Sequence, residues 1–174
     1  MRSSGSLSHI YFQVTPRQMD LGEIALLYPQ LLPDLVAHPG IGLVAGRDGE
    51  QTIVTGKEGT LWIGPDGERL EGRHPLAGYG NGDWAIGQIA RLVRFPHAGD
   101  LVLLGTFDGE RVISFENQVS THGGLGGPQT QPFLAYPPRV CLAAAEIENA
   151  EEVYGQLRAM YAPPYEPQEV SEER

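Results

Sequence analysis

The sequence predicts an α/β fold, and three features of the chain carry that prediction. Residues 100–105 form an almost continuous apolar run between two glycines, which is typical of a central parallel strand buried on both faces. Residues 83–93 repeat apolar side chains at three- and four-residue spacing, which indicates an amphipathic helix. Gly (23) and Pro (14) together exceed one in five of the 174 residues, so we expect short elements joined by many turns.

The N-terminal region predicts one strand and two short helices. An approximate alternation of apolar side chains over residues 7–14 favours a strand. Asp20 is placed to cap a helix over residues 21–28, because Glu23 stands at the capping-box position. Residues 31–37 predict a second short helical segment before a His-Pro-Gly break.

The middle of the chain predicts a buried strand followed by a small antiparallel excursion. Residues 41–45 are a compact apolar run, and an Asp-Gly turn signal follows them. Residues 52–55 and 60–63 are expected to pair as a hairpin across a Gly-rich turn. Residues 71–82 contain four glycines without apolar periodicity and are expected to form a loop.

The C-terminal part predicts short extended pieces, one helix and a tail. Residues 112–115 and 133–136 favour extended structure, the latter as a final strand. Residues 147–160 favour a helix. Residues 163–174 are rich in Pro, Glu and Ser, which predicts a disordered tail. We therefore expect a single α/β domain over residues 1–162.

Charge and cysteine content exclude several classes of partner and site. A formal net charge of -10 argues against nucleic acid, because the chain lacks the basic face that phosphate backbones require. No apolar run approaches the roughly 20 residues that span a bilayer, so we expect a cytoplasmic chain without membrane contact. The single cysteine, Cys141, excludes an intramolecular disulfide and a Cys-based zinc cluster, and is expected in the core.

His122 stands in the most informative loop of the sequence. Four of the next five positions are glycines, which remove nearly every Cβ that would keep another group from the backbone; they are Gly123, Gly124, Gly126 and Gly127. A neutral imidazole is a good zinc ligand, so this loop can face a metal or an anion. The alternative is a sharp surface turn with an exposed histidine.

Five segments carry a resemblance to a known family. FENQVSTHGGLGGPQTQPFLAYP (residues 115–137) resembles the last conserved block of the alkaline phosphatase superfamily, closest to its bacterial type I phosphodiesterase/nucleotide pyrophosphatase-like members. The segments GSLSHIYF (5–12), LVAHPGIGLV (35–44), HPLAGYG (74–80) and FPHAGDLVLLG (95–105) resemble the same group. The resemblance implies a partial α/β/α sandwich of the alkaline phosphatase-like type, with metal-dependent activity on phosphodiesters or nucleotide pyrophosphates.

The resemblance implies a role for His122 and leaves other roles unfilled. In that superfamily a late His-Gly-Gly turn supplies the last ligand of a two-metal site. The resemblance therefore implies that His122 is a metal ligand and that the four glycines after it shape the loop around the site. Complete members also carry a Ser or Thr nucleophile and an Asp-His-Gly motif, and no Asp-His pair occurs here. The chain therefore resembles the C-terminal portion of such a hydrolase, and no catalytic residue is assigned within it. A divalent metal, zinc in the first instance, is expected only if another segment or chain supplies the missing ligands.

Two carboxylates are candidates to support His122. A ligating imidazole normally donates its other N–H to a carboxylate or carbonyl, and Glu116 and Asp100 are the candidates for that role. Both are equally compatible with solvated loop positions. The other histidines, at positions 9, 38, 74 and 97, are expected to bond nearby backbone instead.

Three functional hypotheses follow from these observations. The first is the C-terminal portion of a metal-dependent hydrolase of a small phosphate ester, inactive alone. The second is a non-catalytic binding or regulatory module derived from the same fold. The third is one subunit of a split enzyme, whose partner is the N-terminal half of the same hydrolase or a self-associating copy, joined through an exposed sheet edge.

Overall fold

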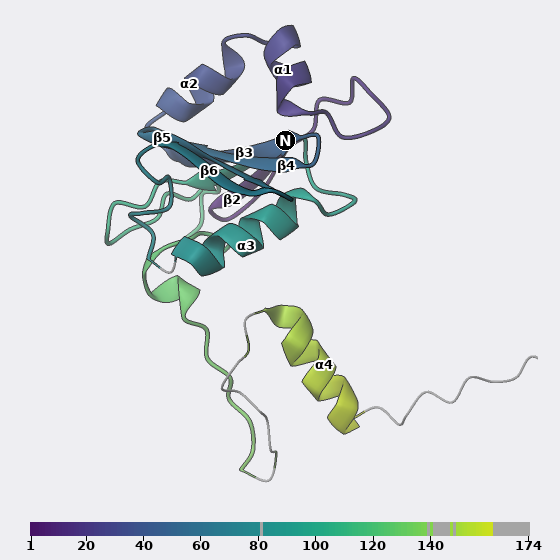
Figure 1. Ribbon diagram of the computed structural model, residues 1–174. Coiled ribbons are helices and arrows are strands. Elements are labelled where there is room, and N and C mark those ends of the chain that lie inside the picture. Colours follow the sequence, from purple (N-terminus) through teal and green to yellow (C-terminus); the bar gives the residue numbers. More distant parts are fainter. Residues whose placement is uncertain (81, 139, 141–146, 148, 162–174) are drawn as a thin grey trace, which may run out of the picture. The chain divides into compact units, whose positions relative to one another are not determined.

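Among the residues that the structure describes, one seven-stranded sheet organises the unit Met1–Pro132 (Figure 1). The computed structural model describes residues 1–80, 82–138, 140, 147 and 149–161. The strands lie in the order β1-β2-β7-β3-β4-β5-β6, and every neighbouring pair is antiparallel. Their bounds are β1 (Arg2–Ser4), β2 (Leu7–Ile10), β3 (Ile41–Asp48), β4 (Gln51–Gly56), β5 (Gly59–Gly64), β6 (Gly67–Gly72) and β7 (Leu101–Gly105).

The predicted parallel α/β/α sandwich is wrong, and the architecture is mixed α+β. The apolar run that predicted a central parallel strand is β7, which pairs antiparallel with both β2 and β3. All five of its residues are buried, as the sequence indicated. Helices cover both faces of the sheet, so its central strand is apolar on both sides whatever its direction. The apolar run therefore indicated that the strand is buried. It did not indicate whether the neighbouring strands are parallel or antiparallel.

Three helices cover the sheet, two on one face and one on the other (Figure 1). α1 (Leu21–Leu27) and α2 (Leu31–Ala37) lie on one face, and α3 (Gly82–Val93) lies on the opposite face. The predicted capping box is confirmed, because Asp20 and Glu23 bond each other's backbone N–H at the start of α1. In the described part of the chain, none of the helices has the length and apolar character that crossing a bilayer requires.

The sheet separates two apolar cores. On the α1/α2 side, Leu101 and Leu103 of β7 pack with Ile24 of α1. On the α3 side, Val102 and Leu104 belong to the second core. The helix and strand residues of that core include Leu43, Val54, Leu61, Ala85, Ile86, Ile89 and Val93. Alternate residues of one strand thus serve both cores, as the two-residue period of a strand requires.

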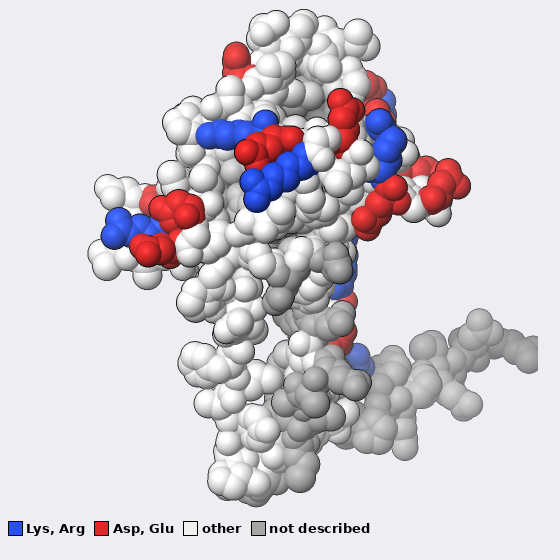
Figure 2. Space-filling model, turned by 60° about the vertical axis from the view of Figure 1, so that its left-hand side comes forward, with Lys and Arg blue, Asp and Glu red and all other residues white. Residues whose placement is uncertain are grey.

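The two outer strands were not predicted as strands. β6 follows the hairpin of β4 and β5 and carries Glu68, Arg69 and Glu71, whereas β1 has three residues. The Arg69 guanidinium lies 3.5 Å from the centroid of the Trp62 ring and covers it. Acidic and basic side chains are interspersed on the side of the molecule seen in Figure 2. Charged and short edge strands discourage pairing with another sheet.

The second unit, Phe133–Arg174, is described by itself. The predicted helix over 147–160 is confirmed as α4 (Ala150–Tyr161). The predicted final strand at 133–136 is wrong, since these residues have no regular secondary structure. The predicted tail at 163–174 and the predicted core position Cys141 lie outside the described residues.

Candidate functional site

The His122 loop packs against the turn of the N-terminal hairpin, which is formed by β1 and β2. The carbonyl oxygen of His122 accepts a hydrogen bond from the Ser6 backbone N–H at 2.8 Å. The Ser6 and Thr121 hydroxyl oxygens lie 3.0 Å apart. Ser6 is itself held to the sheet, because its carbonyl accepts from the Gly105 N–H at 2.9 Å. These bonds fix the backbone of the loop at the end of β7.

Gly5 makes this close approach possible. It has a φ of +61°, and a Cβ on it would lie 2.1 Å from the His122 carbonyl oxygen. On the loop side, Gly123 has a φ of +71°, and a Cβ there would lie 3.0 Å from the Ser4 carbonyl oxygen. Because both contacts involve main-chain atoms, neither can be relieved by rotating a side chain. The two backbones are packed as closely as glycine permits.

The Glu116 carboxylate supports the same contact through the Gly5 backbone. Its Oε2 accepts from the Gly5 backbone N–H at 2.8 Å and from Gln118 Nε2 at 3.0 Å. The Phe115 N–H donates to the Gly5 carbonyl at 2.8 Å, which makes the connection reciprocal. Glu116 thus positions the backbone that holds His122. Its predicted bond to the imidazole ring stays a prediction.

Asp100 lies at the other end of β7. It is 7% exposed, and its two oxygens accept from the backbone N–H groups of Met19 and Phe12, each at 2.7 Å. The five residues of β7 span roughly 16 Å, and the His122 loop attaches beyond Gly105. The structure therefore does not bring Asp100 to His122. Asp100 instead anchors the connection between β2 and α1.

The remaining glycines seat the loop against the sheet. Gly126 has a φ of +90°, and a Cβ there would lie 2.5 Å from the Phe107 ring. A Cβ on Gly124 would lie 2.9 Å from Val112 Cγ1, and Gly127 opens the 3-10 turn η1 (Gly127–Thr130). These glycines were predicted to leave room around a site. Gly124 and Gly126 serve close packing of the loop on its neighbours.

The His122 side chain is exposed although its backbone is fixed. Among the described residues, no three His, Cys, Asp or Glu side chains gather in a way that could hold a metal ion. The geometry can therefore present one imidazole ligand at the surface. The chain matches no protein-family model, no curated protein and no solved structure. The resemblance to the alkaline phosphatase superfamily stays a prediction.

Three other histidines behave as predicted, because each bonds nearby backbone. His9, His38 and His74 accept through Nδ1 from backbone N–H groups at 2.9, 3.1 and 3.2 Å respectively. The donors are Gly99, Gly40 and Leu76. Burial also lowers the pKa of His9, which favours its neutral form.

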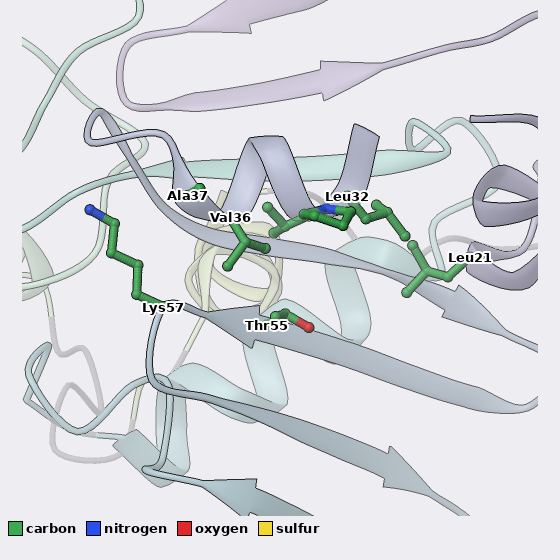
Figure 3. A pocket seen from close by; sticks show the side chains of 8 residues that line it. Leu21, Leu32, Val36, Ala37, Thr55 and Lys57 are labelled. Carbon is green, nitrogen blue, oxygen red and sulfur yellow. The ribbon is translucent and has the colours of Figure 1, made fainter. Parts of the chain in front are cut away.

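Two hollows in the first unit were not predicted from the sequence. The larger, of about 560 Å³, lies between α2 and strands β3 and β4 (Figure 3). Leu32 and Val36 of α2 point toward the strands, with Leu21 at one end and Lys57 at the other. Its lining is apolar apart from Thr55 and Lys57, so it offers few groups that could orient a reacting substrate. The smaller hollow has several charged and polar side chains in its lining, among them Lys57, His74 and Tyr79.

Proposed function

We propose that this chain is the C-terminal portion of a cytoplasmic, metal-dependent phosphodiesterase/nucleotide pyrophosphatase-like hydrolase. Its contribution is one imidazole ligand, His122. The nucleophile and the other ligands come from another segment or chain, so the chain alone is inactive. The fold that the resemblance implied is not part of this proposal.

The observation that carries the proposal is an exposed imidazole on a fixed backbone. A surface histidine ordinarily needs no such support, yet His122 is held through Ser6, Gly5 and the Glu116 carboxylate. A metal ligand must lie within a few tenths of an ångström of its working position. Fixing the main chain restricts the ring to its side-chain rotations, which lowers the entropy lost when a metal binds.

The chemistry explains why a single ligand is insufficient. A catalytic zinc ion is usually held by three protein ligands. When bound, a pair of divalent ions polarises a phosphoryl oxygen and stabilises the leaving oxygen. In this proposal His122 binds one ion, and the neutral imidazole adds no negative charge to an already acidic protein.

The test is metal-dependent activity that depends on His122. The full chain, tagged and purified from its source cells with its associated proteins, is assayed on bis(p-nitrophenyl) phosphate with added Zn²⁺. We expect activity that a chelator removes and that His122→Ala lowers by roughly 100-fold, since loss of a direct ligand should reach the upper end of the effects seen for supporting residues. His97→Ala, which removes another exposed histidine, is the matched control. Equal activity of the His122→Ala and wild-type preparations contradicts the proposal.

A specific observation favours the non-catalytic module as a second candidate. The sheet has helices on both faces, a short edge strand and a charged edge strand, which are properties of a self-contained unit. If no chelator-sensitive activity accompanies the wild-type preparation, the hydrolase proposal fails. The hypothesis of a non-catalytic module then predicts that the His122→Ala variant keeps the thermal stability of the wild type and still binds its associated proteins.

A further inference from the structure

The smaller hollow, of about 290 Å³, lies at the end of the sheet where β4 ends and β3 begins. The β4–β5 turn forms one wall, and the segment 73–79 forms another. Thr106 and Phe107, which follow β7, complete the lining. None of these residues belongs to the His122 loop, although Phe107 packs against Gly126 of that loop. The hollow is thus a separate feature of the same sheet end.

Glycine and a buried tyrosine shape its inner wall. Gly42 sits at an irregularity in the pairing of β3 with β7, between Ile41 and Leu43. A Cβ on Gly42 would lie 2.0 Å from the Tyr79 hydroxyl oxygen, so this hydroxyl touches the Gly42 backbone. Irregular pairing at a strand end commonly re-aims groups toward a site. Here it admits a polar group to an otherwise apolar core.

Tyr79 presents a hydrogen-bond donor in this wall. Its side chain is 9% exposed, and the hydroxyl oxygen interacts with the Phe107 backbone N–H. Burial raises the pKa of the phenol, so the hydroxyl keeps its proton at neutral pH. Since the oxygen already faces an N–H donor, the proton is available to another acceptor.

His74 presents a second donor because of its tautomer. The Leu76 backbone N–H donates to His74 Nδ1 at 3.2 Å, so the proton of the neutral ring is on Nε2. His74 is half-buried and lines the hollow. Its free ring position is therefore an N–H donor and not an acceptor.

The charged groups at the rim add positive charge. Lys57 is the only lysine in the sequence, and no ion pair is recorded for it within the described residues. The acidic side chain of the lining, Glu58, is paired with Arg73 at 3.0 Å. Among the side chains that the structure describes, no carboxylate is paired with the Lys57 ammonium. Lys57, His74 and Tyr79 can each donate a hydrogen bond to a bound acceptor.

We propose that this hollow binds a small oxyanion, the shared chemistry of phosphate and carboxylate groups, through Lys57, His74 and Tyr79. An anion supplies only acceptors and so matches a set of donors. The volume admits a phosphate or a small carboxylic acid and excludes a large ligand. The site does not depend on His122 or on the proposed hydrolase.

The direct test is an NMR titration of the full chain. Backbone amide shifts are followed while sodium phosphate or sodium acetate is added, against sodium chloride at equal ionic strength. We expect saturable shifts at residues 56–58, 73–79 and 106–107 with phosphate, acetate or both. The stronger of the two identifies the source of the oxyanion. Shifts that do not saturate, or that equal those in chloride, overturn the proposal.

Substitutions separate this site from general anion attraction. His74→Asn keeps an acceptor near the Leu76 N–H and removes the ring N–H, and Lys57→Gln changes an exposed turn residue that the fold does not need. Each is expected to weaken binding of the tighter oxyanion by about tenfold, the effect of one hydrogen bond to a charged group. His38→Asn is the matched control, because His38 makes the same Nδ1 bond, to Gly40, outside the hollow. Unchanged affinity in Lys57→Gln and His74→Asn overturns the assignment.

Discussion

Gly5 and Gly49 have nearly the same φ angle and very different surroundings. Their φ angles are +61° and +58°, a region that costs an ordinary residue about 1 kcal/mol or more. Around Gly49 nothing lies within 4 Å of a built Cβ, whereas at Gly5 the His122 carbonyl oxygen lies at 2.1 Å. Comparing alanine substitutions at Gly5 and Gly49 therefore separates the cost of a side chain at positive φ from the cost of disturbing the contact between Gly5 and the His122 loop.

We expect Gly5→Ala to cost roughly 2 kcal/mol more than Gly49→Ala in free energy of unfolding. The difference corresponds to two hydrogen bonds, from Ser6 to His122 and from Gly5 to Glu116, which the displaced loop would lose. Urea denaturation of the two variants measures it. Equal costs would show that the loop accommodates the methyl group, and the fixed backbone invoked for His122 would then be in error.

The sequence predicted His122 as the candidate ligand, and it did not predict the contacts that hold the His122 backbone. The Gly-rich run around His122 is visible locally, as is its exposure in a turn. Its contact with Gly5 joins segments more than a hundred residues apart, and a pairing at that separation leaves no periodicity to read. The carboxylate of Glu116 was identified as a supporting group, but its recorded partner on the hairpin is a backbone amide.

At the scale of elements, the sequence predicted the positions of most strands and of α1, and it did not predict the direction in which the strands pair. The α1 capping box and the strand positions of β3, β4, β5 and β7 follow from side-chain chemistry, which the sequence displays directly. Strand direction depends on the path of the chain between strands, which burial does not reveal. β6 was missed because its side chains are exposed and charged, as suits an edge.

The capping box of α1 carries a pH dependence that the structure specifies. The Arg17 guanidinium, followed by the Asp20 backbone N–H, lowers the pKa of Glu23 to about 2 from an ordinary value of 4.5. A carboxyl group with a depressed pKa in the folded state stabilises the protein above about pH 4.5, and this contribution disappears as the pH falls toward 2. The Arg17 and Glu23 side chains are 58% and 37% exposed, so solvent and salt reduce the effect.

We therefore expect Glu23→Gln to lower the urea midpoint at pH 7 and to change it little near pH 2. Gln retains an oxygen that can accept from Asp20 N–H, so the variant removes chiefly the charge paired with Arg17. Glu68→Gln, on the exposed strand β6, is the control for a general loss of negative charge. A midpoint difference between wild type and Glu23→Gln that stays constant from pH 7 to pH 2 contradicts the expected linkage.

At the scale of the first unit, β7 joins two cores that otherwise lie on opposite faces of the sheet. Leu103 and Leu104 are adjacent, chemically identical and both 3% exposed, yet Leu103 packs in the α1/α2 core and Leu104 in the α3 core. The same ladder of hydrogen bonds to β2 and β3 holds the residues of β7 that face both cores, so disrupting that ladder affects the packing on both faces. We infer that the two cores unfold together, as most small domains do.

Leu103→Ala and Leu104→Ala test this coupling. Each removes a buried leucine and should cost about 2–5 kcal/mol, whereas Leu26→Ala, at a position 83% exposed, should cost less than about 0.5 kcal/mol. Native-state amide exchange is read at Ile24 in α1 and at Ile89 in α3, which are buried in the two different cores. Joint unfolding requires that either leucine variant lower the protection free energy of both amides by the same amount, because both exchange through one opening of the sheet. A loss confined to the helix on the substituted face would mean that the cores open independently, and β7 would then divide the unit instead of uniting it.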